Sequence, residues 1–158
     1  MEKLSQSLED YLEAIFVVSQ KKKVVRVKDV VKMMNVKTAS VIGALRKLVQ
    51  KGFVEHEHYG YIDLTPAGIK KATRIYEKHK VLLRFLTDFL NVDHQVAEKD
   101  ACLIEHFISD ETFEKIIKLL QLLESEPNKI PIWLKGLKNY MNGKTGETTP
   151  VVKPGAAA

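Results

Sequence analysis

The sequence has little cysteine and no long apolar segment. Its 158 residues include one cysteine, Cys102, so the chain cannot form an internal disulfide bond and an intracellular setting is favoured. No run of about 18 apolar residues occurs, so no membrane span is predicted. The N-terminal segment MEKLSQSLEDYLEAIF carries acidic residues where a signal peptide would have its apolar core. We therefore expect a cytoplasmic protein without a membrane partner.

The charge of the chain is unevenly distributed. Residues 1–76 carry 14 Lys and Arg against 8 Asp and Glu, whereas residues 77–158 carry 11 against 12. Apolar residues make up 45% of the sequence, which is enough for an ordinary core in one compact domain or two small ones. A basic first half suggests a polyanionic partner, although a solvated basic surface explains the charge equally well.

The spacing of apolar and capping residues predicts a mainly α protein. Helices are predicted from near Ser7, over 27–34, 37–51, 66–90, 94–108 and 111–125, with strands at 53–58 and 61–64. Two short helices joined by a tight turn and followed by a hairpin form a winged helix-turn-helix. We therefore predict a winged helix-turn-helix domain at 1–65 and an all-helical domain at 66–141. The segment 142–158, rich in Gly, Pro and Thr, is expected to be a flexible tail.

The predicted helix at 37–51 has the polar face of a DNA recognition helix. Small or hydroxylated residues near its start allow close approach to base edges, and basic residues further along can contact phosphates. Double-stranded DNA is therefore the predicted partner, and a helical domain with an ordinary basic face is the alternative. The residues on this face are Lys37, Thr38, Ser40, Gly43, Arg46, Lys47 and Gln50.

The segment ACLIEHF places three chemically distinctive side chains on one helix face. Cys102, Glu105 and His106 follow the i, i+3, i+4 spacing of such a face. Thiolate, carboxylate and imidazole are ligands of divalent transition metals. A buried cysteine beside a surface glutamate and a histidine near a helix end is the simpler alternative, because spacing alone does not bring different helices together. Further candidate ligands on other predicted helices are Asp10, Glu13 and His79.

Four segments in order resemble the diphtheria-toxin-repressor family of metal-dependent transcription regulators. They are EDYLEAIF, LTPAG, EKHKVLLRFLTDFLNV and DACLIEHFISDE, and the resemblance covers about residues 5–125. It implies a cytoplasmic homodimer with an N-terminal winged helix and a helical domain that dimerises and binds metal. It also implies a repressor of metal-homeostasis genes that binds a palindromic operator with Fe²⁺ or Mn²⁺, while Zn²⁺ or Co²⁺ could substitute in vitro. No enzymatic activity or small-molecule substrate is expected.

The resemblance assigns ligands from both branches of the family. Cys102 matches a ligand of the iron-type members and stands where manganese-type members have a glutamate. Leu83 stands where iron-type members have a glutamate ligand, and Glu98 where they have a histidine. The implied metal ligands, a hybrid set, are Asp10, Glu13, His79, Glu98, Cys102, Glu105 and His106. The family's DNA-contact positions are occupied by Lys37, Ala39, Ser40, Gly43, Lys47 and Gln50.

Two other functions fit parts of the pattern. A winged-helix regulator could bind DNA without metal, with the Cys-Glu-His trio serving only in packing. A zinc hydrolase would need an open coordination position and a general base, and the sequence has no His-Glu-x-x-His motif.

The operator sequence cannot be transferred from the iron-type members, because Gly43 stands where they have a glutamine.

Overall fold

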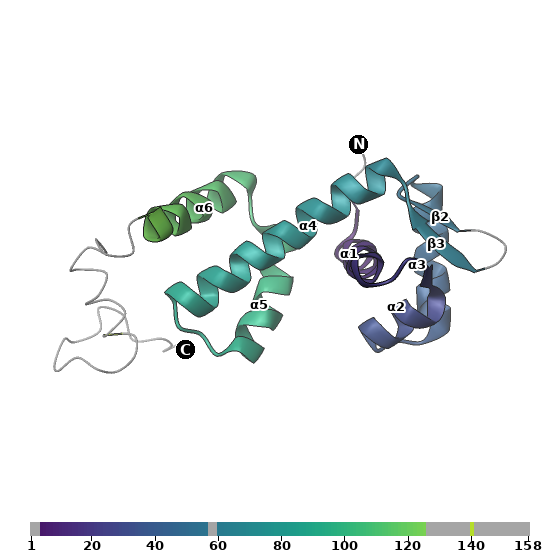
Figure 1. Cartoon of the computed structure of the whole chain (residues 1–158), viewed down its shortest axis with the longest axis horizontal. Coiled ribbons are helices and arrows are strands. Elements are labelled where there is room, and N and C mark those ends of the chain that lie inside the picture. Colours follow the sequence, from purple (N-terminus) through teal and green to yellow (C-terminus); the bar gives the residue numbers. More distant parts are fainter. Residues whose placement is uncertain (1–3, 57–59, 126–139, 141–158) are drawn as a thin grey trace, which may run out of the picture.

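One long helix, α4 (Pro66–Arg84), connects two groups of elements (Figure 1). The computed structural model describes residues 4–56, 60–125 and 140. Three helices and a small sheet gather at the N-terminal end of α4, and two helices lie along its second half (Figure 1). The predicted architecture, a winged helix-turn-helix followed by a helical domain, is confirmed. The tail predicted at 142–158 lies outside the described residues. Within those residues no helix is both long and apolar enough to cross a membrane.

The first group is built on α1 (Gln6–Lys21), α2 (Val27–Met34) and α3 (Thr38–Gln50). Asn35 ends α2 in the left-handed conformation, and Gly52 follows α3 with a φ of 73°, the conformation that Asn and Gly adopt readily after a helix. On α3, Ile42 and Val49 are exposed rather than in the core, and Ala44 is buried instead. The buried residues that join the three helices are Leu8, Tyr11, Leu12, Ile15, Phe16, Val30, Val41, Leu45 and Leu48.

The wing contains one strand more than the sequence predicted. β1 (Val25–Arg26), β2 (Val54–His56) and β3 (Tyr61–Leu64) form an antiparallel sheet in the order β1-β3-β2. Of the predicted strand 53–58, residues 54–56 form β2, and residues 57–59 lie outside the described part. Ile62 on the central strand is buried, and the sheet therefore closes the core of the winged helix.

The LTPAG segment fixes the start of α4 against the winged helix. The Thr65 hydroxyl accepts a hydrogen bond from the Gly68 N–H at 3.0 Å and donates one to the Gly52 carbonyl at 2.7 Å. Pro66 occupies the first helical position, where its missing N–H costs nothing. A Cβ atom on Gly68 would lie 1.9 Å from the Phe53 carbonyl oxygen, so this close approach requires glycine.

The second group consists of α5 (His94–Phe107) and α6 (Asp110–Ser125). The predicted helix 66–90 is α-helical to Arg84 and then widens into a π-helical turn, η1 (Phe85–Phe89). Asp93 caps α5 by accepting hydrogen bonds from two backbone N–H groups. The helices predicted from near Ser7 and over 111–125 begin slightly earlier, at Gln6 and Asp110. Ser5 precedes α1, and the Ser109 hydroxyl accepts a hydrogen bond from the Thr112 N–H before α6.

Candidate metal centre

The candidate ligands converge from three helices. Asp10 and Glu13 come from α1, His79 from α4, and the others from α5. Within each of two groups, one ligand atom per residue lies within 4.8 Å of the others. We name these groups the first cluster and the second cluster. The first cluster is Asp10, Cys102, Glu105 and His106, and the second is Glu13, His79 and Glu105.

Glu105 belongs to both clusters. Its Oε2 lies 2.9 Å from His79 Nδ1, and its Oε1 lies 3.4 Å from His106 Nε2. The Glu105 side chain is completely buried, at 0% exposure. Because its two oxygens face different clusters, this carboxylate is placed to share two cations.

The first cluster contains buried polar atoms with no hydrogen-bond partner. Among the described residues, Asp10 Oδ1, Glu105 Oε1 and His106 Nε2 are the buried side-chain atoms in this state. Asp10 Oδ1 lies only 2.7 Å from His106 Nε2, so the two atoms are close enough to contact the same ion. Buried polar atoms without partners cost free energy, and three converging on one point fit a cation. The donor set of carboxylate, imidazole and thiol suits a divalent transition metal.

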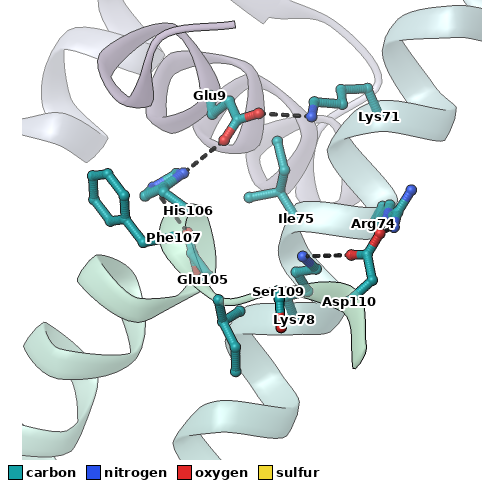
Figure 2. A pocket seen from close by; sticks show the side chains of 11 residues that line it. Glu9, Lys71, Arg74, Ile75, Lys78, Glu105, His106, Phe107, Ser109 and Asp110 are labelled. Atoms are coloured by element: carbon teal, nitrogen blue, oxygen red, sulfur yellow. Dashed lines mark hydrogen bonds and ion pairs between the residues drawn. The ribbon is translucent and has the colours of Figure 1, made fainter. Parts of the chain in front are cut away.

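A neighbouring carboxylate fixes the orientation of His106. Glu9 Oε2 lies 2.8 Å from His106 Nδ1, and Glu9 Oε1 lies 2.6 Å from Lys71 Nζ (Figure 2). Burial raises the pKa of Glu9, but hydrogen bonds from Lys71 and His106 outweigh it and leave the pKa below its usual value. An ionised Glu9 can accept a proton from His106 Nδ1, and in the neutral ring tautomer with its proton on Nδ1 the other nitrogen, Nε2, is an acceptor facing the cluster.

Sequence reasoning missed Glu9. Its burial could have been inferred, because Glu9, Leu12 and Phe16 fall on one helical face and the last two are core residues. A carboxylate on the same helix face as core residues needs a charged or hydrogen-bonding partner, and Glu9 has two, Lys71 and His106.

The two clusters together contain more acidic groups than can be ionised at low cost when buried. Burial and the neighbouring Glu105 raise the pKa of Glu13 to about 7. Burial also raises the pKa of Asp10, despite the nearby His106. The pKa of Cys102 rises to about 11, mainly through burial and then through the surrounding carboxylates. A divalent cation would stabilise the deprotonated form of each group.

Glu98 lies at the edge of the second cluster. Its Oε1 is 3.4 Å from His79 Nε2, its side chain is half exposed, and it belongs to neither cluster. Leu83, for which the resemblance implied no ligand role, packs against the core between α4 and α5. A cavity of about 640 Å³ between α1–α2 and α4–α5 borders both clusters and reaches Cys102. An ion can therefore approach the clusters from this side.

The predicted DNA contacts lie on an accessible surface. Lys37 precedes α3 at its N-cap position, and the rest lie on the helix. The opposite face of α3 packs into the core through Val41, Leu45 and Leu48. The exposed residues are Lys37, Thr38, Ala39, Ser40, Gly43, Lys47 and Gln50.

Two family models match consecutive parts of the chain. Residues 3–62 match the N-terminal DNA binding domain of the iron dependent repressors, and residues 65–134 match their metal binding and dimerisation domain. An uncharacterized HTH-type transcriptional regulator of Methanocaldococcus jannaschii is 38% identical over 114 residues, covering 72% of this chain and 91% of that protein. The chain belongs to the iron-dependent repressor family. The resemblance to metal-dependent regulators of the diphtheria-toxin-repressor type is thus confirmed.

Other members of this family share the fold. The HTH-type transcriptional regulator MntR of Lysinibacillus sphaericus is 32% identical over 122 residues, which is 77% of this chain and 87% of that protein. The crystal structure of T. acidophilum IdeR superposes with a TM-score of 0.64 at 25% identity, covering 76% of this chain and 55% of that one. The structure of the manganese regulator SloR superposes with a TM-score of 0.65 at 28% identity, covering 72% of this chain and 53% of that one. This chain therefore spans about half the length of these solved structures.

Proposed function

We propose that this protein is a cytoplasmic homodimeric repressor that binds operator DNA when Fe²⁺ or Mn²⁺ occupies the clusters. One observation carries the proposal: partnerless buried atoms of Asp10 on α1 meet those of Glu105 and His106 on α5. Because α1 packs within the winged helix and α5 within the helical group, one ion would join the two halves. The proposed metal ligands are Asp10, Glu13, His79, Cys102, Glu105 and His106, with Glu98 at the edge.

Repulsion between acidic side chains on α1 and α5 gives the metal its proposed effect on DNA binding. Without a cation, the α1 carboxylates Asp10 and Glu13 face the buried Glu105, and repulsion between them opposes close packing of α1 on α5. A bound cation supplies positive charge that removes this repulsion. It shifts the equilibrium only as far as it binds the closed arrangement more tightly than the open one. In a dimer, the closed arrangement would set two α3 helices into successive major grooves of a palindromic operator, about 34 Å apart.

The dimer surface that we assign is the apolar face of α5. Val96, Leu103, Ile104 and Phe107 lie on this helix and are exposed, Phe107 to 75%. Contiguous exposed apolar residues mark an interaction surface, and the family domain matched over this region is described as a dimerisation domain. We assign residues 1–65 to the DNA-binding domain and 66–141 to the dimerisation and metal-binding domain.

The hybrid ligand set leaves both Fe²⁺ and Mn²⁺ as candidates for the physiological metal. The thiol of Cys102 favours Fe²⁺ over the harder Mn²⁺, whereas the carboxylates of Asp10, Glu13 and Glu105 favour Mn²⁺. Because Glu105 is shared, we propose that each subunit can hold two ions, the first between Asp10 and His106. Zn²⁺ and Co²⁺ would serve as substitutes in vitro.

The test is DNA retention with and without metal. Duplexes would be selected from a random pool by the protein in Mn²⁺ or anaerobic Fe²⁺, and their affinity measured by fluorescence anisotropy with each metal and with excess chelator. Bound metal would be counted in parallel. We expect tight binding only with metal, and its loss in His106→Ala but not in Gln95→Ala, an exposed change on the same helix. Equal affinity in chelator would instead support a winged-helix regulator that binds DNA without metal.

A further inference from the structure

Glu9 is held between side chains from two different helices (Figure 2). Lys71 on α4 lies 2.6 Å from one Glu9 oxygen, and His106 on α5 lies 2.8 Å from the other. The side chains of Glu9 and His106 are 7% and 2% exposed, whereas that of Lys71 is 32% exposed. The three residues therefore form a chain that runs from the surface of α4 to the back of the first cluster.

We propose that Lys71 is a positioning residue for the metal centre. By holding Glu9, and through it His106, Lys71 keeps His106 Nε2 directed at Asp10 and Glu105. The inference rests on the proposed function, because it takes His106 as a ligand. It goes beyond that function by assigning a surface lysine, which touches no proposed ligand directly, to the control of metal affinity.

The structure gives Lys71 this role because Glu9 has few other means of staying in place. A buried carboxylate must have its oxygens satisfied or its burial is costly. His106 satisfies Oε2, and Lys71 satisfies Oε1. Without Lys71, Oε1 would need water, and Glu9 would be drawn away from His106 towards the solvent. His106 would then lose the partner that fixes its ring.

Two other cations on the same face of α4 provide matched controls. Arg74 and Lys78 line the same cavity of about 350 Å³, but both pair with Asp110 at the start of α6 (Figure 2). They contact neither Glu9 nor His106 in the pairs described. Replacing Lys78 therefore removes the same charge from the same surface while leaving the chain from Lys71 to His106 intact.

Positioning and simple electrostatics predict effects of opposite sign. If Lys71 acted only through its charge, Lys71→Met would remove a repulsive cation and strengthen metal binding, as would Lys78→Met. If Lys71 positions His106, Lys71→Met weakens binding. Loss of a group that orients a ligand typically lowers metal affinity by about 10- to 100-fold, and we expect about tenfold here because Lys71 acts through Glu9.

The effect should be confined to the first cluster. Glu9 contacts His106, which belongs to that cluster, and contacts neither Glu13 nor His79 of the second. Co²⁺ distinguishes the two clusters. Cys102 belongs to the first cluster alone, and a cobalt–thiolate bond gives a charge-transfer absorption band. Anaerobic Co²⁺ titration of the full chain therefore reports first-cluster occupancy through this band and total uptake through calorimetry.

The experiment compares Lys71→Met, Lys71→Arg, Glu9→Gln and Lys78→Met with the wild type. We expect the band of Lys71→Met to need about tenfold more Co²⁺, Lys71→Arg to restore most of the affinity, and Lys78→Met to show no loss. Glu9→Gln combined with Lys71→Met should cost no more than Glu9→Gln alone, because Lys71 acts through Glu9. Circular dichroism would confirm folding, with Lys71→Gln as the substitute if Lys71→Met does not fold.

The outcomes separate this inference from the proposed function. A wild type that binds Co²⁺ without a thiolate band would remove Cys102 from the proposed ligand set, and the calorimetric Co²⁺ affinities of Lys71→Met and Lys78→Met would then decide the role of Lys71. A wild type with the band and a Lys71→Met variant that binds Co²⁺ as tightly, or more tightly, would overturn the role of Lys71 alone. Additive losses in the double variant would also overturn it, because Lys71 would then act independently of Glu9.

Discussion

Replacing Cys102 by glutamate should change how many protons the protein releases when it binds metal. Burial and the nearby carboxylates raise the pKa of the Cys102 thiol to about 11, so the thiol is protonated in the metal-free protein. A metal must displace that proton, and apparent affinity should therefore rise about tenfold per pH unit between about pH 8 and 9. The comparable carboxylate, Glu13, has a pKa of about 7, so a glutamate at residue 102 would already be ionised there. Cys102→Glu should lose this dependence.

The assay is anaerobic calorimetry in two buffers of different protonation enthalpy, which counts protons released per ion. We expect the wild type to release about one proton more than Cys102→Glu above about pH 8, and the variant to shift its preference towards Mn²⁺, since a carboxylate is harder than a thiolate. Cys102→Ala serves as the control that removes the ligand without replacing it. Equal proton counts and an unchanged metal preference in all three proteins would mean that Cys102 is a small buried side chain and not a ligand.

Three further outcomes follow from named contacts. Lys47→Ala should weaken binding to all DNA sequences and lower the salt dependence by about one unit per subunit, whereas Ser40→Ala should change sequence preference, which competition binding at several salt concentrations distinguishes. Gly68→Ala should lower the free energy of unfolding by about 1–3 kcal/mol in urea titrations, because its Cβ would meet the Phe53 carbonyl; wild-type stability would contradict this close approach. Glu105→Gln should impair uptake of both ions in metal counting, so loss of only one would show that the clusters do not share Glu105.

The helices of this protein were predictable because their signals are local. Asn35 and Gly52 end helices where the chain must turn left-handed, and Thr65 caps α4 within its own first turn. β1 was not predictable, because a strand of two residues is too short to show alternation and exists through its pairing with β3. The π-helical turn over Phe85–Phe89 has no sequence signal of its own beyond the apolar pattern that continues through it.

The candidate site was predictable in its residue types but not in its geometry. The spacing of Cys102, Glu105 and His106 places them on one face of α5 from sequence alone. Their meeting with Asp10 depends on how α1 packs against the second group, which periodicity does not encode. Lys71 was not predicted for the same reason, because a partly exposed lysine on a basic helix gains its role only from the helix opposite.

The placement of the ligands explains why metal would act on α3, although α3 contributes none. Each cluster takes one residue from α1. Asp10 joins three residues of α5 in the first cluster, and Glu13 joins His79 of α4 and Glu105 of α5 in the second. The opposite side of α1 packs against α2 and α3 through a continuous core. Because protein interiors are close-packed, a movement of α1 is transmitted through this core to α3. An ion that fixes α1 against α5 would therefore fix the direction of the recognition helix as well, and either cluster can exert this effect through the same helix.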